Sequence, residues 1–201
     1  MGLLSREQIE AMGFRCVGEN CRLSDRASYY NCANIAIGDN VRIDDFCVLS
    51  AGAGGIEIGS YVHVAVYTSL IGAGKIVLAD FSNISSRVSI YSSSDDYSGA
   101  AMTNPMVPPE FTNVAHADVT VGRHAIIGSG SVVLPGVVLD DGVSVGALSL
   151  VNRSCSPFGI YAGVPARRIK ERKRDLLALE ARLLESLAPD RSRIVQADGE
   201  S

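Results

Sequence analysis

The sequence predicts an all-β fold in which short parallel strands coil into triangular turns, and two repeating patterns carry this prediction. Aliphatic residues recur at every sixth position in five blocks of three, and every one of these positions holds Ile, Leu or Val. The positions are Ile37, Ile43, Leu49, Ile58, Val64, Leu70, Leu78, Ile84, Ile90, Val121, Ile127, Val133, Leu139, Val145 and Val151. Glycine often follows directly, as in Gly38, Gly59, Gly122, Gly128 and Gly146. An amphipathic helix would need spacings of three and four, so the period of six excludes helices here.

The length of each block gives the shape of a turn. The blocks that start at positions 121 and 139 are 18 residues apart, which corresponds to three strands of six residues. Each strand points one aliphatic side chain inward, and stacked turns bury a continuous column that no single turn buries alone. The earlier intervals of 21 and 20 residues contain the glycine-rich segments 51–55 and 72–75, which predict bulges at one corner. A β-sandwich is the alternative, but simple alternation would not keep a phase of six.

The composition restricts the classes of function. The chain has 201 residues with a net charge of −4, and 47% of them are hydrophobic. It lacks the basic surplus of a nucleic-acid-binding protein, and it lacks the apolar run of about 20 residues that a membrane span requires. The first residues contain no hydrophobic signal core, so we expect a cytoplasmic protein. No CxxC pair occurs among Cys16, Cys21, Cys32, Cys47 and Cys155, which favours free thiols in a reducing compartment.

The repeat also divides the chain. Residues 1–34 are expected to form an N-terminal helix, starting at Ser5, and an irregular first turn. Residues 35–169 form the coil of about five to six turns, residues 170–188 a C-terminal helix, and residues 189–201 a flexible tail. The C-terminal helix is predicted from leucines at helical spacing, and we expect it to pack on the prism or on a partner subunit. These leucines are Leu176, Leu179, Leu183 and Leu187.

Two segments outside the repeat carry functional signals. Residues 91–118 break the phase of six and are rich in Ser, Pro and Asn, and long loops of this kind are usually functional, although a tolerated insertion is the alternative. Residues 162–169 read AGVPARRI. With the six-residue repeat, this segment resembles the closing motif A-G-x-P-A-[KR]-x-[IL] of the hexapeptide-repeat acyltransferases. That family folds as a left-handed parallel β-helix and forms homotrimers, and its loop at this place reaches toward the neighbouring subunit.

The resemblance implies an activity and a donor site. The family transfers an acetyl or other short acyl group from acetyl-CoA or a related acyl-CoA to an amino or hydroxyl group of a sugar. The sugar is expected to be nucleotide-linked or a polysaccharide precursor, with no tightly bound cofactor and no metal. The positions that match the pantetheine contacts are Ser129, Gly146, Ala147, Ala162 and Gly163. The adenosine phosphate end needs cations, and the matched ones are Arg167, Arg168 and Lys170, for which contact with solvent alone is the alternative.

The candidate catalytic residues are His63, Asp95 and Asp96. The sugar O-acetyltransferases of the family carry a histidine at the start of the loop, where this chain has Asp95 followed by Asp96. The segments 61–67 (YVHVAVY) and 95–99 (DDYSG) resemble a branch that acylates amino sugars. An amine needs less help from a base than a hydroxyl, so the missing histidine favours an amine acceptor. The alternatives are a surface histidine without a charged neighbour on its own prism, and an Asp pair that only forms a turn.

Two other functions stay open at this level. A metalloenzyme like the γ-class carbonic anhydrases needs three histidines, two of them five residues apart, but His63, His116 and His124 are separated by 53 and 8 residues. A noncatalytic trimeric scaffold is the second alternative, and the closing motif and the long loop argue against it. The sequence does not decide the acceptor sugar, the acyl chain or the choice between O- and N-acylation.

Overall fold

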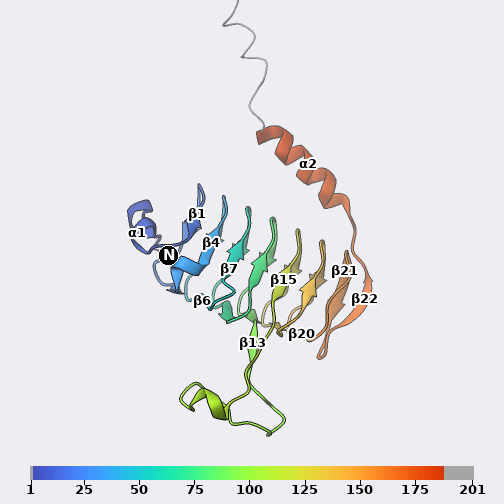
Figure 1. The fold of residues 1–201 in the computed structure, drawn as a ribbon. Coiled ribbons are helices and arrows are strands. Elements are labelled where there is room, and N and C mark those ends of the chain that lie inside the picture. The colour runs from blue at the N-terminus through green and yellow to red at the C-terminus, as the bar shows by residue number, and fades with distance from the viewer. Residues whose placement is uncertain (1, 188–201) are drawn as a thin grey trace, which may run out of the picture.

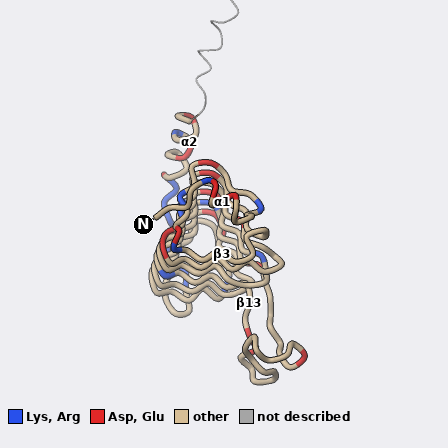
Figure 2. Tube along the Cα trace, turned by 90° about the vertical axis from the view of Figure 1, so that its left-hand side faces the viewer, with Lys and Arg blue, Asp and Glu red and all other residues tan. Residues whose placement is uncertain are grey.

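A computed structural model describes residues 2–187 and shows a parallel β-helix with a protruding loop and a long C-terminal helix (Figure 1). Three parallel sheets form the three faces of a triangular prism (Figure 2). The first face contains β1 (Cys16–Val17), β4 (Ile35–Ile37), β7 (Ile56–Ile58), β10 (Ile76–Leu78), β15 (Val119–Val121) and β18 (Val138–Leu139). The second contains β2 (Arg22–Leu23), β5 (Arg42–Ile43), β8 (His63–Val64), β11 (Asn83–Ile84), β16 (Ile126–Ile127), β19 (Ser144–Val145), β21 (Gly159–Ala162) and the antiparallel β22 (Arg167–Glu171). The third contains β3 (Ser28–Tyr30), β6 (Val48–Ala51), β9 (Ser69–Gly72), β12 (Ser89–Tyr91), β17 (Val132–Val133) and β20 (Leu150–Val151). The predicted fold class is confirmed.

The inward column has the composition that the period of six predicts. All of the predicted inward side chains are buried, and Ile58, the most accessible of them, is 3% exposed. Successive turns place them in register, as in the pairing of Ile37 with Ile58 and of Ile84 with Ile127. Burial of each such side chain contributes roughly 1.5–3 kcal/mol, so the column is the main source of stability.

The coil has about seven turns, so the expected five to six turns is too low. The segment before residue 35 is a further turn in register, because Val17 pairs with Ile37 and Leu23 with Ile43. At the other end, Tyr161 pairs with Val145 and closes the last turn. The first turn, predicted as irregular, is regular, and the last turn is not counted by the pattern, because Tyr29 and Tyr161 stand at positions where the other turns carry aliphatics.

The N-terminal helix begins where the sequence predicts. Ser5 caps α1 (Arg6–Ala11) and forms a capping box with Gln8, which satisfies backbone groups at both positions. Ile9 is the buried residue of this helix and contacts the core cluster. Helix α1 therefore covers the N-terminal end of the column.

The three edges of the prism have different properties and are named accordingly. The helix edge lies between the first and second faces and includes Tyr61, Phe81 and His124. The aromatic edge lies between the second and third faces and includes Phe46 and Tyr67. The loop edge lies between the third and first faces, where the chain leaves the prism after Ser92. All five of the residues that define the first two edges have positive φ angles of 58° to 64°, which places the chain in the left-handed region at these corners.

The C-terminal helix begins later than the sequence predicts. Helix α2 covers Asp175–Leu187 and begins five residues later than expected, because Arg167–Glu171 pair with β21 as an antiparallel strand. The helix extends away from the prism (Figure 1), and none of its residues is buried. Glu180 joins it to the helix edge. The predicted tail 189–201 lies outside the described residues.

The loop is an arm rather than a structureless insertion. Its base is a two-stranded antiparallel ribbon of β13 (Ser93–Ser94) and β14 (Ala115–His116), and a short 3₁₀ helix (Pro109–Phe111) lies near its tip. Figures 1 and 2 show this arm projecting well beyond the prism. Another 3₁₀ turn (Cys32–Asn34) precedes β4. Within residues 2–187, no helix has the length and apolarity needed to cross a membrane.

Candidate active site

His63 lies on the outer surface of the second face, next to a carboxylate that the sequence analysis missed. Its Nε2 atom is 2.9 Å from Oδ2 of Asp44, and Nε of Arg42 donates to the other oxygen of Asp44 at 2.7 Å. Arg42 and His63 are register partners on neighbouring strands. The expectation that His63 has no charged neighbour on its own prism is therefore wrong.

The pair has the geometry of a positioned imidazole. Burial alone would raise the pKa of Asp44, but the hydrogen bonds from His63 and Arg42 lower it below its ordinary value. Asp44 is therefore ionised at neutral pH and favours the tautomer of His63 that carries hydrogen on Nε2. The Nδ1 atom is then the nitrogen that can accept a proton from a substrate.

Asp95 lies at the base of the loop, where two cavities meet. One cavity of about 410 Å³ lies against the third face and is also lined by Tyr91, Tyr97 and Pro135. The other, of about 560 Å³, lies within the loop and is lined by Asp95 together with His116. Asp95 is exposed, so its carboxylate is accessible from both cavities.

The neighbouring residues of the loop have more structural contacts. Asp96 accepts a hydrogen bond from the backbone N–H of Ser98 at 2.7 Å, and the contacts with Ser98 lower the pKa of Asp96. This is the turn geometry that the sequence analysis gave as the alternative. The Nδ1 atom of His116 lies 2.8 Å from Oγ of Ser93, across the ribbon that pairs these two residues.

The predicted pantetheine positions gather at the C-terminal end of the aromatic edge. Ser129, Ala147 and Gly163 are exposed, and Gly146 and Ala162 are half-buried. Successive turns approach closely there, since a Cβ on Gly146 would lie 3.0 Å from the Cβ of Ala162. The resulting strip has little side-chain bulk, which is the surface that an extended chain with amide groups requires.

The three predicted phosphate-binding cations lie on β22 and are exposed. Arg168 forms an ion pair with Glu171, whereas Arg167 bonds only a backbone oxygen, that of Ala166, at 3.0 Å. Arg167 and Arg168 line a small cavity of about 150 Å³ together with Arg153. Arg153 carries no signal of its own in the sequence, because it lies outside the closing motif and meets the other two arginines only at the end of the coil.

The remaining histidine belongs to the helix edge. The Nε2 atom of His124 lies 2.6 Å from Oε2 of Glu180 in α2, and the His124 ring stacks on Phe81. Burial, followed by the charges of Arg123 and Arg172, lowers the pKa of His124. The three histidines therefore lie in three separate places. Among residues 2–187, no cluster of His, Cys, Asp and Glu has the arrangement of a metal site.

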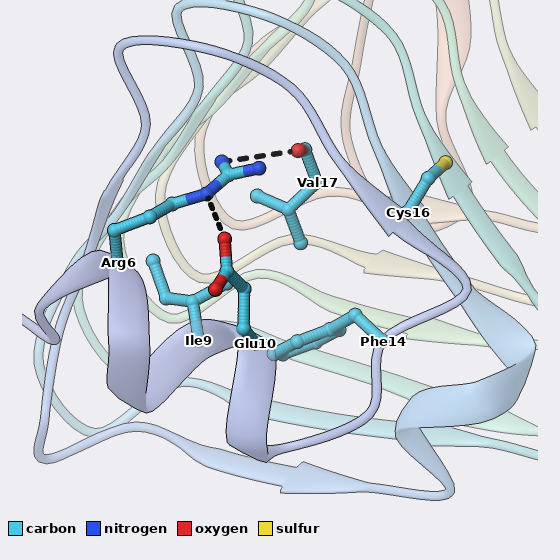
Figure 3. Close-up of a pocket in the computed structure, with 6 residues that line it drawn as sticks. All are labelled: Arg6, Ile9, Glu10, Phe14, Cys16 and Val17. Carbon is cyan, nitrogen blue, oxygen red and sulfur yellow. Dashed lines mark hydrogen bonds and ion pairs between the residues drawn. The ribbon is translucent and has the colours of Figure 1, made fainter.

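A further cavity of about 330 Å³ lies at the N-terminal end and contains none of the predicted site residues. Figure 3 shows Arg6 and Glu10 of α1 facing Val17 across it. Arg6 donates to the backbone oxygen of Val17 at 3.2 Å and pairs with Glu10 at 3.0 Å. These bonds hold α1 on the first turn, so we interpret this cavity as structural.

The chain is similar to known acyltransferases. The chain is 55% identical over 181 residues to a dTDP-4-amino-4,6-dideoxy-D-glucose acyltransferase of Escherichia coli, a match that covers 90% of this chain and 94% of the relative. It is 30% identical over 171 residues to WbbJ of E. coli K12, a putative lipopolysaccharide biosynthesis O-acetyl transferase, covering 76% and 80% of the two chains. No family model matches the chain. The chain belongs to the hexapeptide-repeat sugar acyltransferases.

A solved structure agrees with this assignment over nearly the whole chain. AntD, an N-acyltransferase from Bacillus cereus in complex with dTDP and 3-hydroxybutyryl-CoA, is 46% identical and superimposes with a TM-score of 0.89 over 92% of this chain and 97% of that one. Other structures of AntD contain dTDP-4-amino-4,6-dideoxyglucose with coenzyme A. This chain is therefore an enzyme that transfers an acyl group from acyl-CoA to a sugar, as the closing motif predicted.

Proposed function

We propose that this enzyme acylates the 4-amino group of dTDP-4-amino-4,6-dideoxyglucose or a closely related nucleotide-linked amino sugar. The observation that carries the proposal is the 55% identity to an acyltransferase of that sugar over 94% of the relative's length. The absence of a loop histidine at Asp95 also supports an amine acceptor. We place the reaction in the cytoplasm and in the assembly of surface polysaccharides, as the sequence analysis expected.

The chemistry needs few groups. The lone pair of the neutral amine attacks the thioester carbon, so that a C–N bond forms and the carbonyl oxygen becomes negative. Collapse of this intermediate breaks the C–S bond and releases the thiolate of CoA. One amine proton leaves to a base and passes to the sulfur, which gives an amide and a free thiol. Asp95 or the His63–Asp44 pair is suited to hold that proton in transit.

We further propose that the site forms between two protomers of a homotrimer. His63 lies on the second face, whereas Asp95 lies at the base of the arm that leaves the loop edge, and neither of the two cavities at Asp95 is lined by His63. The arm carries exposed apolar side chains that have no partner within residues 2–187, including Tyr97 at 94% and Met106 at 90%. A neighbouring prism that receives this arm would bring Asp95 to its second face.

Variants of AntD support a role for one serine as well. Solved AntD variants are changed at a serine or at an aspartate ten positions further along the chain. At the start of the loop, two pairs have that separation, Ser85 with Asp95 and Ser86 with Asp96. We assign Ser85, because it directly follows the inward Ile84 at the end of β11, the strand next to the one that carries His63. We propose Asp95 as a catalytic residue ahead of Asp96, whose oxygen is held by the turn.

The test is an assay of CoA thiol release with two acceptors. With acetyl-CoA and 3-hydroxybutyryl-CoA as donors, we expect dTDP-4-amino-4,6-dideoxyglucose to be acylated and dTDP-glucose, which has a hydroxyl at that carbon, to be inert. Addition of a chelator should leave the rate unchanged. Equal rates with both acceptors, or no thiol release with either donor, would reject the amine as the acceptor group.

A further inference from the structure

The aromatic edge carries a stacked pair of aromatic side chains that stays nearly half exposed among residues 2–187. The rings of Phe46 and Tyr67 lie 5.0 Å apart with an angle of 18° between their planes. Both side chains are nearly half exposed, at 45% and 49%. Arg87 of the next turn lies over the far face of the stack, 5.2 Å from the centre of the Tyr67 ring. The other end of the stack, at Phe46, faces the N-terminal turns.

Two arginines lie on the second face beside this end of the stack. Arg22 and Arg42 are register partners on β2 and β5, and Arg42 is in turn the partner of His63 on β8. Neighbouring strands are about 4.8 Å apart, so the two guanidinium groups can reach one small anion together. Both arginines are exposed. The Nε–H of Arg42 donates to Asp44, and its terminal amino groups have no carboxylate partner among residues 2–187. Arg22 likewise has no carboxylate partner among these residues.

The order of these groups along the prism matches the order of groups in the two substrates. The small-residue strip proposed for pantetheine occupies the turns after Ser85, toward the C-terminal end. The arginines and the aromatic stack occupy the turns before it, toward the N-terminal end. His63 lies in the same turn as Tyr67, and Ser85 lies in the next turn, before the strip begins. A donor and an acceptor that enter from opposite ends would therefore meet at the proposed reaction centre.

We propose that Arg22 and Arg42 bind the diphosphate of the acceptor, and that the stack of Phe46 and Tyr67 binds its pyrimidine base. This inference rests on the proposed function, since it assigns the nucleotide part of the same acceptor. Guanidinium groups bind phosphate oxygens in a bidentate manner. A flat base stacks on an exposed aromatic ring through its face, so this contact does not depend on which base it is. A nucleoside diphosphate has a partner for each group, since its phosphates can bind the arginines while its base stacks on the aromatic pair.

The experiment measures binding of dTDP alone by titration calorimetry, together with steady-state kinetics. Arg22→Ala and Phe46→Ala are each expected to weaken dTDP binding at least fivefold and to raise the KM for the amino sugar by a similar factor. The kcat at saturation should stay within twofold, because neither residue contacts the acyl group. Arg22→Lys should recover only part of the affinity. Arg15→Ala is the matched control, since Arg15 pairs with Glu57 at 2.7 Å and lies outside the second face.

The outcomes separate this inference from the proposed function. If the unchanged protein acylates the amino sugar but Arg22→Ala and Phe46→Ala bind dTDP as it does, the nucleotide site is elsewhere and only this inference fails. If Phe46→Ala or Tyr67→Ala alters the sizing profile, the aromatic edge is a contact between subunits, which also overturns it. If the unchanged protein binds no dTDP and acylates no amino sugar, the proposed function fails as well.

Discussion

The helix edge and the aromatic edge both place residues with ring side chains at corners where the backbone has positive φ angles, but the two edges differ in what covers these rings. At the helix edge Tyr61 stacks on Phe81 at 4.9 Å and Phe81 on His124 at 5.0 Å. Arg123 lies over this stack and joins it to Glu180 of α2. At the aromatic edge Phe46 and Tyr67 make the same kind of stack and stay exposed. A covered stack contributes to stability, whereas an exposed one next to a reaction centre is available for a ligand.

The largest effect on kcat is expected from substitutions of the residues proposed for the reaction, which lie away from the covered helix edge. His63→Ala and Asp95→Ala should each lower kcat at least tenfold, and general acid–base roles allow losses of about 10²–10⁴-fold. Sizing profiles and melting temperatures should match those of the unchanged protein, because both side chains lie outside the inward column. Rates close to the unchanged protein in both variants would remove the site assignment.

A substitution at the covered edge should have the opposite signature. Phe81→Ala loses the stacks with Tyr61 and His124 and the contact with Arg123, and we expect it to lower the free energy of unfolding by about 2 kcal/mol. The kcat and KM of the folded enzyme should not change. Phe46→Ala serves as the control in urea denaturation, with an expected loss below about 1 kcal/mol because its ring is half exposed. Equal losses of stability would contradict the difference between the edges.

A smaller effect is expected at the end of the proposed donor site. The double variant Arg167→Ala, Arg168→Ala should raise the KM for acetyl-CoA several-fold, because these guanidinium groups are proposed to bind its phosphate. A truncated pantetheine thioester lacks that phosphate and should be used almost as well by the double variant as by the unchanged enzyme. The same loss with both donors would contradict a phosphate contact.

The smallest effect concerns the acid side of the stability profile. The lowered pKa of Asp44 means that its ion pairs stabilise the fold above the ordinary pKa of an aspartate, near pH 4, and that this contribution is lost as pH falls through the pKa in the folded state. Asp44→Asn should therefore be less stable at pH 7, by less than about 1 kcal/mol for a pair near the surface. Thermal unfolding should show the difference shrinking below pH 4. A difference that is constant with pH would mean that Asp44 acts through packing alone.

The sequence predicts the coil well because one rule, an inward aliphatic at every sixth position, is local and repeated. It predicts the place of the loop for the same reason, since Asp95 follows the last regular position of its block. The rule ends where aromatic residues replace aliphatics, as at Tyr29 and Tyr161, so the first turn is predicted as irregular and the last turn is not counted. Helix α2 was placed too early because a strand that folds back on β21 has no signature of its own.

The polar contacts are harder to predict because they depend on register across turns. Asp44 and His63 are 19 residues apart, and they meet only because one turn with its glycine-rich insertion has 21 residues, which places His63 beside Arg42. Arg153 reaches Arg167 through the closing of the last turn. The antiparallel ribbon brings His116 to Ser93 across 23 residues of loop. Predicting each contact requires the lengths of the insertions, and the period of six does not give these lengths.

The most direct test asks whether His63 and Asp95 act in one site from different chains. Inactive His63→Ala and Asp95→Ala proteins, carrying different affinity tags, would be unfolded and refolded together, and the mixed trimers isolated by passage over both tags. If each site combines the second face of one protomer with the arm of its neighbour in the proposed closed ring of three, every mixed trimer contains one intact site, so the isolated mixed trimers recover about a third of the full activity. Mixed trimers that stay as inactive as their parents would show that both residues serve a site within one protomer, or no site at all.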